Sequence, residues 1–189
     1  MKDAILPASK VSISQAIFGT SRLGGTVQQY DKKKSLAILE KAVDSGITTF
    51  DTANIYAQGN SEKLLGAVVK RHRDKVVIAT KGGYALSSKG QLLSLVKPMI
   101  RKVIGSRPGL VRAAGKVRGG QMKQDFSRTG LTKSLDDSLK RLNSDYVDIY
   151  QLHSPDQETL EKGEVFEILE DFKQAGKIRA AGVSLLSWE

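Results

Sequence analysis

Short apolar runs typical of β-strands alternate along this chain with longer amphipathic segments typical of α-helices. Among the 189 residues, the strand-type runs occupy 11–18, 47–50, 76–79, 146–152 and 178–184. Apolar residues recur at helical spacing in the segments between them, at 31–46, 60–75, 127–142 and 156–176. A helix between two strands returns the chain to the edge where the first strand began, which favours parallel pairing. The sequence therefore predicts an α/β fold with five parallel strands.

Each predicted helix has one apolar face and recognisable ends. Asp31 and Ser127 can accept hydrogen bonds at helix N-termini, and Gly46 and Asn143 suit helix C-termini. His72 lies in a charged run at the end of a predicted helix, so we expect it to be solvated. The last predicted helix is expected to point five apolar side chains inward: Val165, Phe166, Ile168, Leu169 and Phe172.

The formal net charge of +10 is concentrated in one stretch of the chain. Residues 85–123 contain nine Lys and Arg residues and no Asp or Glu, so they account for nine of the ten net positive charges. We interpret 85–124 as a basic insert after the third strand, and favour a solvated loop over a lid on an anionic ligand. Nucleic-acid binding is disfavoured, because the insert has no aromatic side chains on which bases could stack.

The chain contains no cysteine and only two histidines. Disulfides, thiolate nucleophiles and thiolate metal sites are excluded, and a histidine-rich metal site is disfavoured. Residues 1–11 lack the apolar core of a secretory signal, and no segment approaches the roughly 20 apolar residues of a membrane span. We therefore expect no metal, no membrane span and a cytoplasmic location.

Three of the strand-type runs lead into polar residues that can do acid–base chemistry together. Asp51 and Tyr56 follow the second run, Lys81 follows the third, and His153 follows the fourth. The carboxyl ends of parallel strands meet at one edge of a sheet or one rim of a barrel, where α/β folds place their chemistry. We expect these four side chains to lie together there.

The four residue types suit proton donation to a carbonyl oxygen. A tyrosine with its usual pKa of about 10 is a poor acid near neutral pH, but an adjacent ammonium stabilises the phenolate and lowers that pKa. Lys81 can supply this ammonium, and Asp51 can keep it charged and in position. His153 can donate a hydrogen bond to a substrate carbonyl, whose oxygen becomes negative as hydride arrives.

The segments around these residues resemble the aldo-keto reductase superfamily over essentially the whole chain. The matching residues are 18–20, 23–25, 46–56, 61–62, 66, 79–81, 145–153, 176–179 and 182–184. The resemblance implies a (β/α)8 TIM barrel that reduces aldehydes and ketones to alcohols with a nicotinamide cofactor. NADP is the expected cofactor, and NAD is the alternative.

The resemblance also implies catalytic roles for the four polar residues. Tyr56 matches the family's proton donor, and Lys81 matches the lysine that lowers the pKa of that tyrosine. Asp51 matches the carboxylate that supports this lysine, and His153 matches the residue that orients the substrate.

Further residues match the family's cofactor contacts, and two positions depart from its pattern. Thr20, Asp51 and Ser184 are the residues that the resemblance assigns to the cofactor. Leu185 stands where the family often has asparagine, which would remove one hydrogen bond to the cofactor. Ser154 stands where some members have a bulky residue, which suggests a roomier or more polar pocket.

A complete barrel of this kind has eight strands and typically about 250 residues. This chain supplies five strands, so we interpret residues 1–189 as a single reductase-like domain that is incomplete at its C-terminus. The absent part is where the family binds most of the dinucleotide. The sequence is therefore interpreted as the N-terminal portion of a reductase.

Three other functions are open to such a chain. It could be a non-catalytic subunit that senses a cofactor or binds a partner through the basic insert, although docking does not need the four polar residues. It could be an inactive fragment. A binder of nucleic acid or anionic membranes would act through the insert and lose affinity steeply with salt, and we rank it last.

Overall fold

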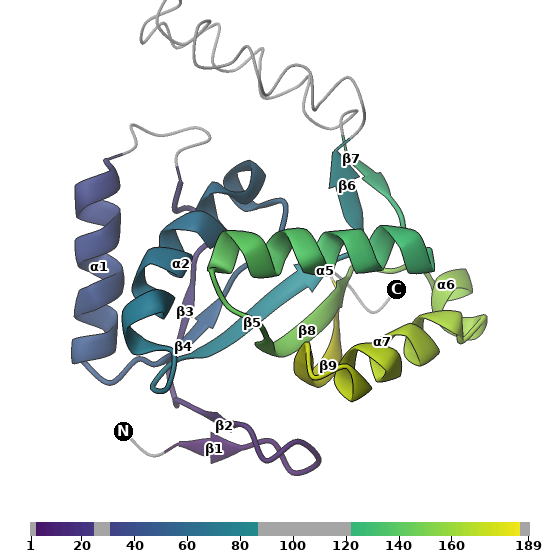
Figure 1. Ribbon diagram of the computed structural model, residues 1–189, viewed down its shortest axis with the longest axis horizontal. Helices are drawn as coiled ribbons and strands as arrows, with labels where there is room; N and C mark the ends of the chain where they lie inside the picture. Colours follow the sequence, from purple (N-terminus) through teal and green to yellow (C-terminus); the bar gives the residue numbers. More distant parts are fainter. Residues whose placement is uncertain (1–2, 25–30, 87–121, 186–189) are drawn as a thin grey trace, which may run out of the picture.

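The computed structural model describes residues 3–24, 31–86 and 122–185, so most of the predicted basic insert lies outside the described residues. In the described part, the main sheet has five strands: β3 (Ile17–Gly19), β4 (Thr49–Asp51), β5 (Val77–Gly82), β8 (Val147–His153) and β9 (Ile178–Ser184). The strands lie side by side in chain order, and every neighbouring pair is parallel (Figure 1). The predicted parallel sheet is confirmed.

The described helices follow the strands as predicted (Figure 1). They are α1 (Lys32–Asp44), α2 (Asn60–His72), α5 (Arg128–Leu142), α6 (Gln157–Glu161) and α7 (Glu164–Gln174). The side chain of Asp31 accepts a hydrogen bond from the backbone of Lys34, and Ser127 accepts one from Gly130. Asn143 ends α5 in the left-handed conformation that asparagine tolerates. These sequence signals for helix ends are confirmed.

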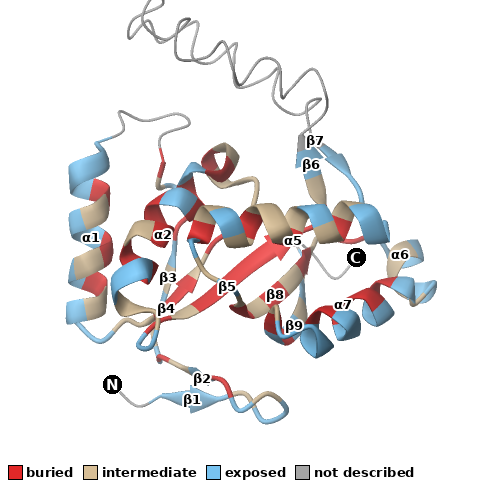
Figure 2. Ribbon diagram, viewed as in Figure 1, coloured by how far each residue is buried: buried red, intermediate tan, exposed pale blue. Residues whose placement is uncertain are grey.

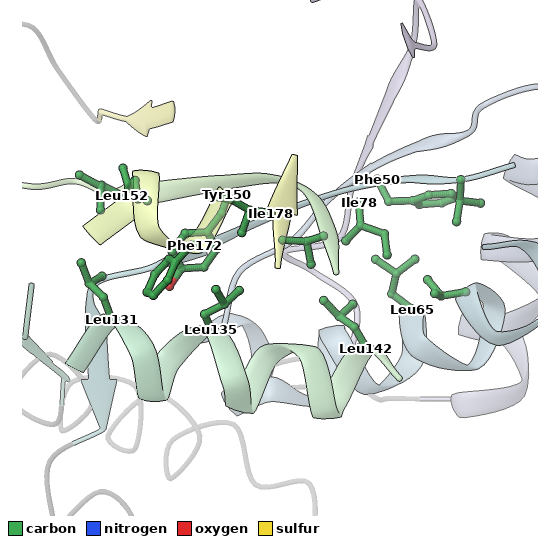
Figure 3. Packing of buried hydrophobic residues seen from close by; sticks show 14 of the residues in the cluster. Phe50, Leu65, Ile78, Leu131, Leu135, Leu142, Tyr150, Leu152, Phe172 and Ile178 are labelled. Carbon is green, nitrogen blue, oxygen red and sulfur yellow. The ribbon is translucent and has the colours of Figure 1, made fainter. Parts of the chain in front are cut away.

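The hydrophobic core lies between the helices and the sheet. Leu131, Leu135 and Leu142 project from α5 toward the strands, where they meet residues such as Ile78 and Tyr150 (Figure 3). In α1, α2 and α5 the buried residues lie on one side of the helix and exposed residues on the other (Figure 2), and α1 packs beside α2. These apolar contacts therefore fix the positions of the helices relative to the strands.

The last predicted helix differs from the structure in two ways. It is divided into α6 and α7 by Gly163, whose φ of 76° no helix interior accommodates. Phe166 was expected to point inward, but its side chain is 49% exposed. Val165 and Ile168 supply the buried face, and Phe166 lies about 100° around the helix from Val165. The prediction for Phe166 was wrong.

His72 is less solvated than the sequence indicated. Its Nε2 lies 2.9 Å from Glu40 Oε2, and only 25% of its side chain is exposed. Glu40 belongs to α1, so this contact joins α1 to the end of α2, which packs beside it. The charged run around His72 gave no indication of its contact with Glu40, which lies more than thirty residues earlier in the chain.

Two antiparallel hairpins lie at opposite ends of the sheet (Figure 1). β1 (Ala4–Ile5) pairs with β2 (Ser12–Ile13) near the amino ends of the strands, where Ser14 and Thr49 exchange hydrogen bonds of 2.8 and 3.0 Å. β6 (Tyr84–Leu86) pairs with β7 (Met122–Gln124) and begins just after β5 ends. None of the described helices is long and apolar enough to cross a membrane.

At Gly66, helix α2 lies directly against the backbone at the end of α5. A Cβ atom at this position would lie 2.5 Å from the backbone oxygen of Arg141. We therefore expect Gly66→Ala to lower the free energy of unfolding by roughly 1–3 kcal/mol, because backbone atoms cannot move aside as side chains can. Urea denaturation measures this change. Gly19→Ala is the matched control, since a Cβ atom there meets nothing within 4 Å. An equal effect of the two substitutions would contradict the proposed clash.

Candidate active site

The ammonium of Lys81 is the centre of the site. Lys81 lies inside β5, because this strand continues to Gly82 rather than ending at Ala79 as the apolar run suggested. Its Nζ donates to both carboxylate oxygens of Asp51 at 2.7 Å and to the carbonyl oxygen of Thr52 at 2.9 Å. Only 6% of the lysine side chain is exposed. A buried ammonium with a bidentate carboxylate and a carbonyl has the partners that its burial demands.

Tyr56 lies on the other side of the same ammonium. Lys81 Nζ is 3.4 Å from the Tyr56 hydroxyl oxygen and 5.1 Å from the centre of its ring. Tyr56 begins the short 3-10 helix η1 (Tyr56–Gly59), in which Ala57 and Gln58 adopt left-handed backbone conformations. Such conformations cost of order 1 kcal/mol or more for residues other than glycine. The surrounding structure therefore holds the turn that presents Tyr56.

His153 completes the group of four. Its ring lies edge-on to that of Tyr56, with centroids 6.1 Å apart, and edge-on to that of Tyr84 at 5.2 Å. Burial lowers the pKa of His153 below its usual value, the Lys81 ammonium lowers it further, and the Asp51 carboxylate partly opposes them. The imidazole is therefore neutral at neutral pH. The structure brings together the four residues that the sequence predicted.

The backbone of Asp51 is held by residues from two other segments. Thr20 donates to the Asp51 carbonyl oxygen from its backbone at 2.8 Å and from its hydroxyl at 3.0 Å. Ser61 donates to the Thr20 carbonyl oxygen at 2.9 Å, and its hydroxyl is 3.2 Å from that of Thr52. The Thr20 side chain is fully buried, so in this arrangement its hydroxyl supports Asp51.

Ser184 lies at the end of β9, directly opposite His153 in the strand register. Its carbonyl oxygen accepts from the backbone of Ser154 at 2.7 Å. Ser154 has a left-handed φ of 52°, which turns the chain away from the sheet just after His153. Leu185, which replaces the expected asparagine, is 39% exposed.

Three residues at the site were not singled out from the sequence. Tyr84 covers one side of His153, and its hydroxyl accepts from Gln124 Nε2 at 3.2 Å. The same Gln124 nitrogen donates to the carbonyl oxygen of Ser154 at 2.6 Å, which ties the β6–β7 hairpin to the rim. Asn54 donates to the backbone oxygen of Tyr84, which pairs with Gln124 at this same end of the hairpin. The double glycine after Lys81 was the available signal, because it indicates that the chain bends back over the strand ends.

The arrangement supplies a hydroxyl proton donor beside a fixed positive charge and a neutral imidazole. Within residues 3–24, 31–86 and 122–185, no group of three or more His, Cys, Asp or Glu residues could hold a metal ion. The contact between Lys81 and Tyr56 can serve acid–base chemistry, because the ammonium would stabilise the charge on a phenol that loses its proton.

Comparison with known proteins gives a consistent result. The sequence model of the Aldo/keto reductase family matches residues 16–189. An aldo-keto reductase of Bacillus subtilis (strain 168) is 31% identical over 189 residues, which cover 99% of this chain and 46% of the relative. An aldo-keto reductase of Alternaria alternata is 33% identical over 187 residues, covering 93% of this chain and 47% of the relative. The chain thus spans about half the length of the curated relatives it matches.

A solved structure extends the comparison to the fold. The holo form of an aldo-keto reductase from Bacillus halodurans matches with a TM-score of 0.74 and 28% sequence identity. The match covers 98% of this chain and 51% of that protein. The five-stranded sheet is therefore part of a (β/α)8 barrel, as predicted.

The lowered pKa of His153 can be measured directly. In a His72→Gln variant His153 is the one remaining histidine, and we expect its NMR titration midpoint below the ordinary value of 6.5. The unfolded chain would bind this proton at a higher pH than the folded chain does. The contribution of His153 to the free energy of unfolding should therefore fall as the pH drops below about 6.5, and this contribution should become constant below the pKa of His153 in the folded protein. A midpoint above 6.5 would mean that the Asp51 carboxylate outweighs burial.

Proposed function

Because this chain belongs to the aldo/keto reductase family, we propose that it carries the proton-donating site of an oxidoreductase that reduces aldehydes and ketones to alcohols. The substrate is a small carbonyl compound, and the cofactor is NADPH or NADH, with NADP favoured. One observation carries this proposal. The Lys81 ammonium is in contact with both carboxylate oxygens of Asp51 and with the hydroxyl of Tyr56.

Tyr56 is the proposed proton donor. Its hydroxyl proton passes to the carbonyl oxygen of the substrate, and the phenolate left behind lies next to the Lys81 ammonium. Asp51 holds that ammonium through two hydrogen bonds of 2.7 Å, so the positive charge is in place before the reaction begins. Charge that is fixed in advance at a water-poor site stabilises a transition state without the cost of reorganisation.

His153 is the proposed orienting residue. Because its imidazole is neutral at neutral pH, it can donate a hydrogen bond to the carbonyl oxygen without bringing a second full positive charge close to Lys81. The edge-on contacts with Tyr56 and Tyr84 hold the plane of its ring. A carbonyl oxygen between Tyr56 and His153 would then receive donors from two sides.

The residues of this chain fit one end of a nicotinamide cofactor. Among the described residues, the buried Oε1 of Gln151 has no hydrogen-bond partner, and its strand neighbour is Gly182, two residues before Ser184. An unpaired buried acceptor suits the amide group of a carboxamide, which donates hydrogen bonds. Asp51 and Ser184 are the proposed cofactor contacts in this chain, whereas Thr20, the third residue expected from the sequence, is fully buried and supports the Asp51 backbone instead. When bound, the cofactor would supply the hydride that reduces the carbonyl carbon.

The alternative of a non-catalytic, cofactor-sensing subunit is less well supported. Such a subunit has no use for an ammonium held between a carboxylate and a phenol, and burying that ammonium carries a cost. Since relatives are about twice as long, we propose that residues 1–189 form the N-terminal portion of the catalytic domain.

Tyr56→Phe tests the role of the phenol. The substitution keeps the ring and removes the proton, so we expect the rate of carbonyl reduction to fall roughly 10²–10⁴-fold. The loss of NADPH absorbance with a panel of small aldehydes measures this rate. Tyr146→Phe is the matched control, because the Tyr146 ring packs against Arg73 away from the site and keeps that contact as phenylalanine. A Tyr56→Phe protein with the full parental rate would refute the assigned role.

A further inference from the structure

We propose that Asn54 is a positioning residue, which fixes the proton donor Tyr56 and the aromatic side chain of Tyr84 relative to Lys81. The inference rests on the proposed function above, since it concerns the same site. Asn54 lies between Asp51 and Tyr56 in the chain, and its side chain leaves this loop to join two other segments.

Asn54 makes three hydrogen bonds, two to the stretch from Lys81 to Tyr84 and one to α5. Its side-chain Nδ2 donates to the backbone oxygen of Tyr84 at 2.8 Å and to the hydroxyl of Ser134 on α5 at 2.9 Å. Its backbone nitrogen donates to the carbonyl oxygen of Lys81 at 3.2 Å. One residue therefore holds both ends of the stretch from Lys81 to Tyr84.

That stretch needs an external support, because its two central residues are glycines. Gly83 has a φ of 108°, a conformation that side chains rarely adopt, and Gly82 has no room for one. A Cβ atom on Gly82 would overlap the hydroxyl of Tyr150, and one on Gly83 would overlap the ring of Phe126. Gly82 and Gly83 thus have no side chains that could fix the shape of this stretch, and glycine has the greatest backbone freedom of all residues.

The contacts call for an amide rather than a carboxylate at position 54. The backbone oxygen of Tyr84 can only accept a hydrogen bond, so the atom facing it must be a donor. The other side-chain atom, Oδ1, is buried and has no partner in the described part of the chain. Aspartate has the same shape, but it would place a second acceptor against the Tyr84 oxygen.

Asn54 is linked to two residues of the proposed site, Tyr56 along the chain and Tyr84 through a hydrogen bond. Tyr56 follows it by two residues and reaches the Lys81 ammonium, while the ring of Tyr84 packs edge-on against His153. If the Asn54 contacts are lost, the Tyr56 loop and the Tyr84 bend can move independently of each other. A displacement of 1 Å at a reacting group can cost as much as 10²-fold in rate.

The test compares Asn54→Ala and Asn54→Asp with the parent chain. Asn60→Asp is the matched control, because it makes the same chemical change at an exposed position six residues later. Amide hydrogen exchange is followed by mass spectrometry, and NADPH-dependent carbonyl reduction is followed on the same samples. Ser134→Ala, which removes one of the two side-chain partners of Asn54, serves as a milder variant if the Asn54 variants fold poorly.

We expect both Asn54 variants to exchange at least tenfold faster in residues 52–58 and 82–86, with β8 and β9 unchanged. Ser134→Ala should accelerate the same two segments to a smaller extent. The kcat of the Asn54 variants should fall about 10–100-fold, while the KM for NADPH stays within about twofold. Asn60→Asp should match the parent in both measurements.

Two results would overturn the inference: unchanged exchange in both segments, or faster exchange there with an unchanged kcat. If the parent chain reduces no carbonyl, the proposed function fails instead. The exchange data then still decide whether Asn54 holds the two segments together.

Discussion

The fold is arranged around one buried ammonium. Lys81 is nearly inaccessible to solvent, and its charge is tolerated because Asp51 and the Thr52 carbonyl surround it. These partners come from the end of β4, so the pairing of β4 with β5 must have the correct register for the charge to be neutralised. A slip of one residue would leave an unpaired ion inside the protein. The same contact therefore selects the register of the sheet and prepares the proposed proton donor.

Behind this ion pair lies a second buried charge, which fixes the helices. Glu62 on α2 is fully buried; its carboxylate accepts from the Thr80 hydroxyl at 2.7 Å and from Arg141 Nε at 2.6 Å. Thr80 is the residue before Lys81, and Arg141 is near the end of α5. Two helices and the central strand are thus joined by one carboxylate, directly behind the site. Apolar packing gives the layers their cohesion, and this contact sets their relative positions.

Much of this organisation could be predicted from the sequence. Strands, helices and the four polar residues at strand ends follow local rules, because apolar periodicity and end signals act over a few residues. The parts that were missed depend on contacts between distant segments. Asn54 acquires its partners only when the bend after Lys81 folds back toward it, and His72 meets Glu40 only when α1 packs beside α2. Phe166 was misplaced for a different reason, since hydrophobicity alone does not say which of two adjacent residues faces the core.

The turn after Tyr56 has a consequence for the order in which the protein folds. Its left-handed residues are stabilised from far away in the sequence, since Gly24 packs against Ala57 and the side chain of Arg141 packs against Gly59. Isolated peptides of this sequence would avoid the conformation, so we expect the turn to form after the helices have docked. Substitutions within it should then change the unfolding rate and leave the folding rate nearly constant, which a chevron analysis would reveal. The proposed catalytic loop would be the last part of the barrel segment to fold and the first to unfold.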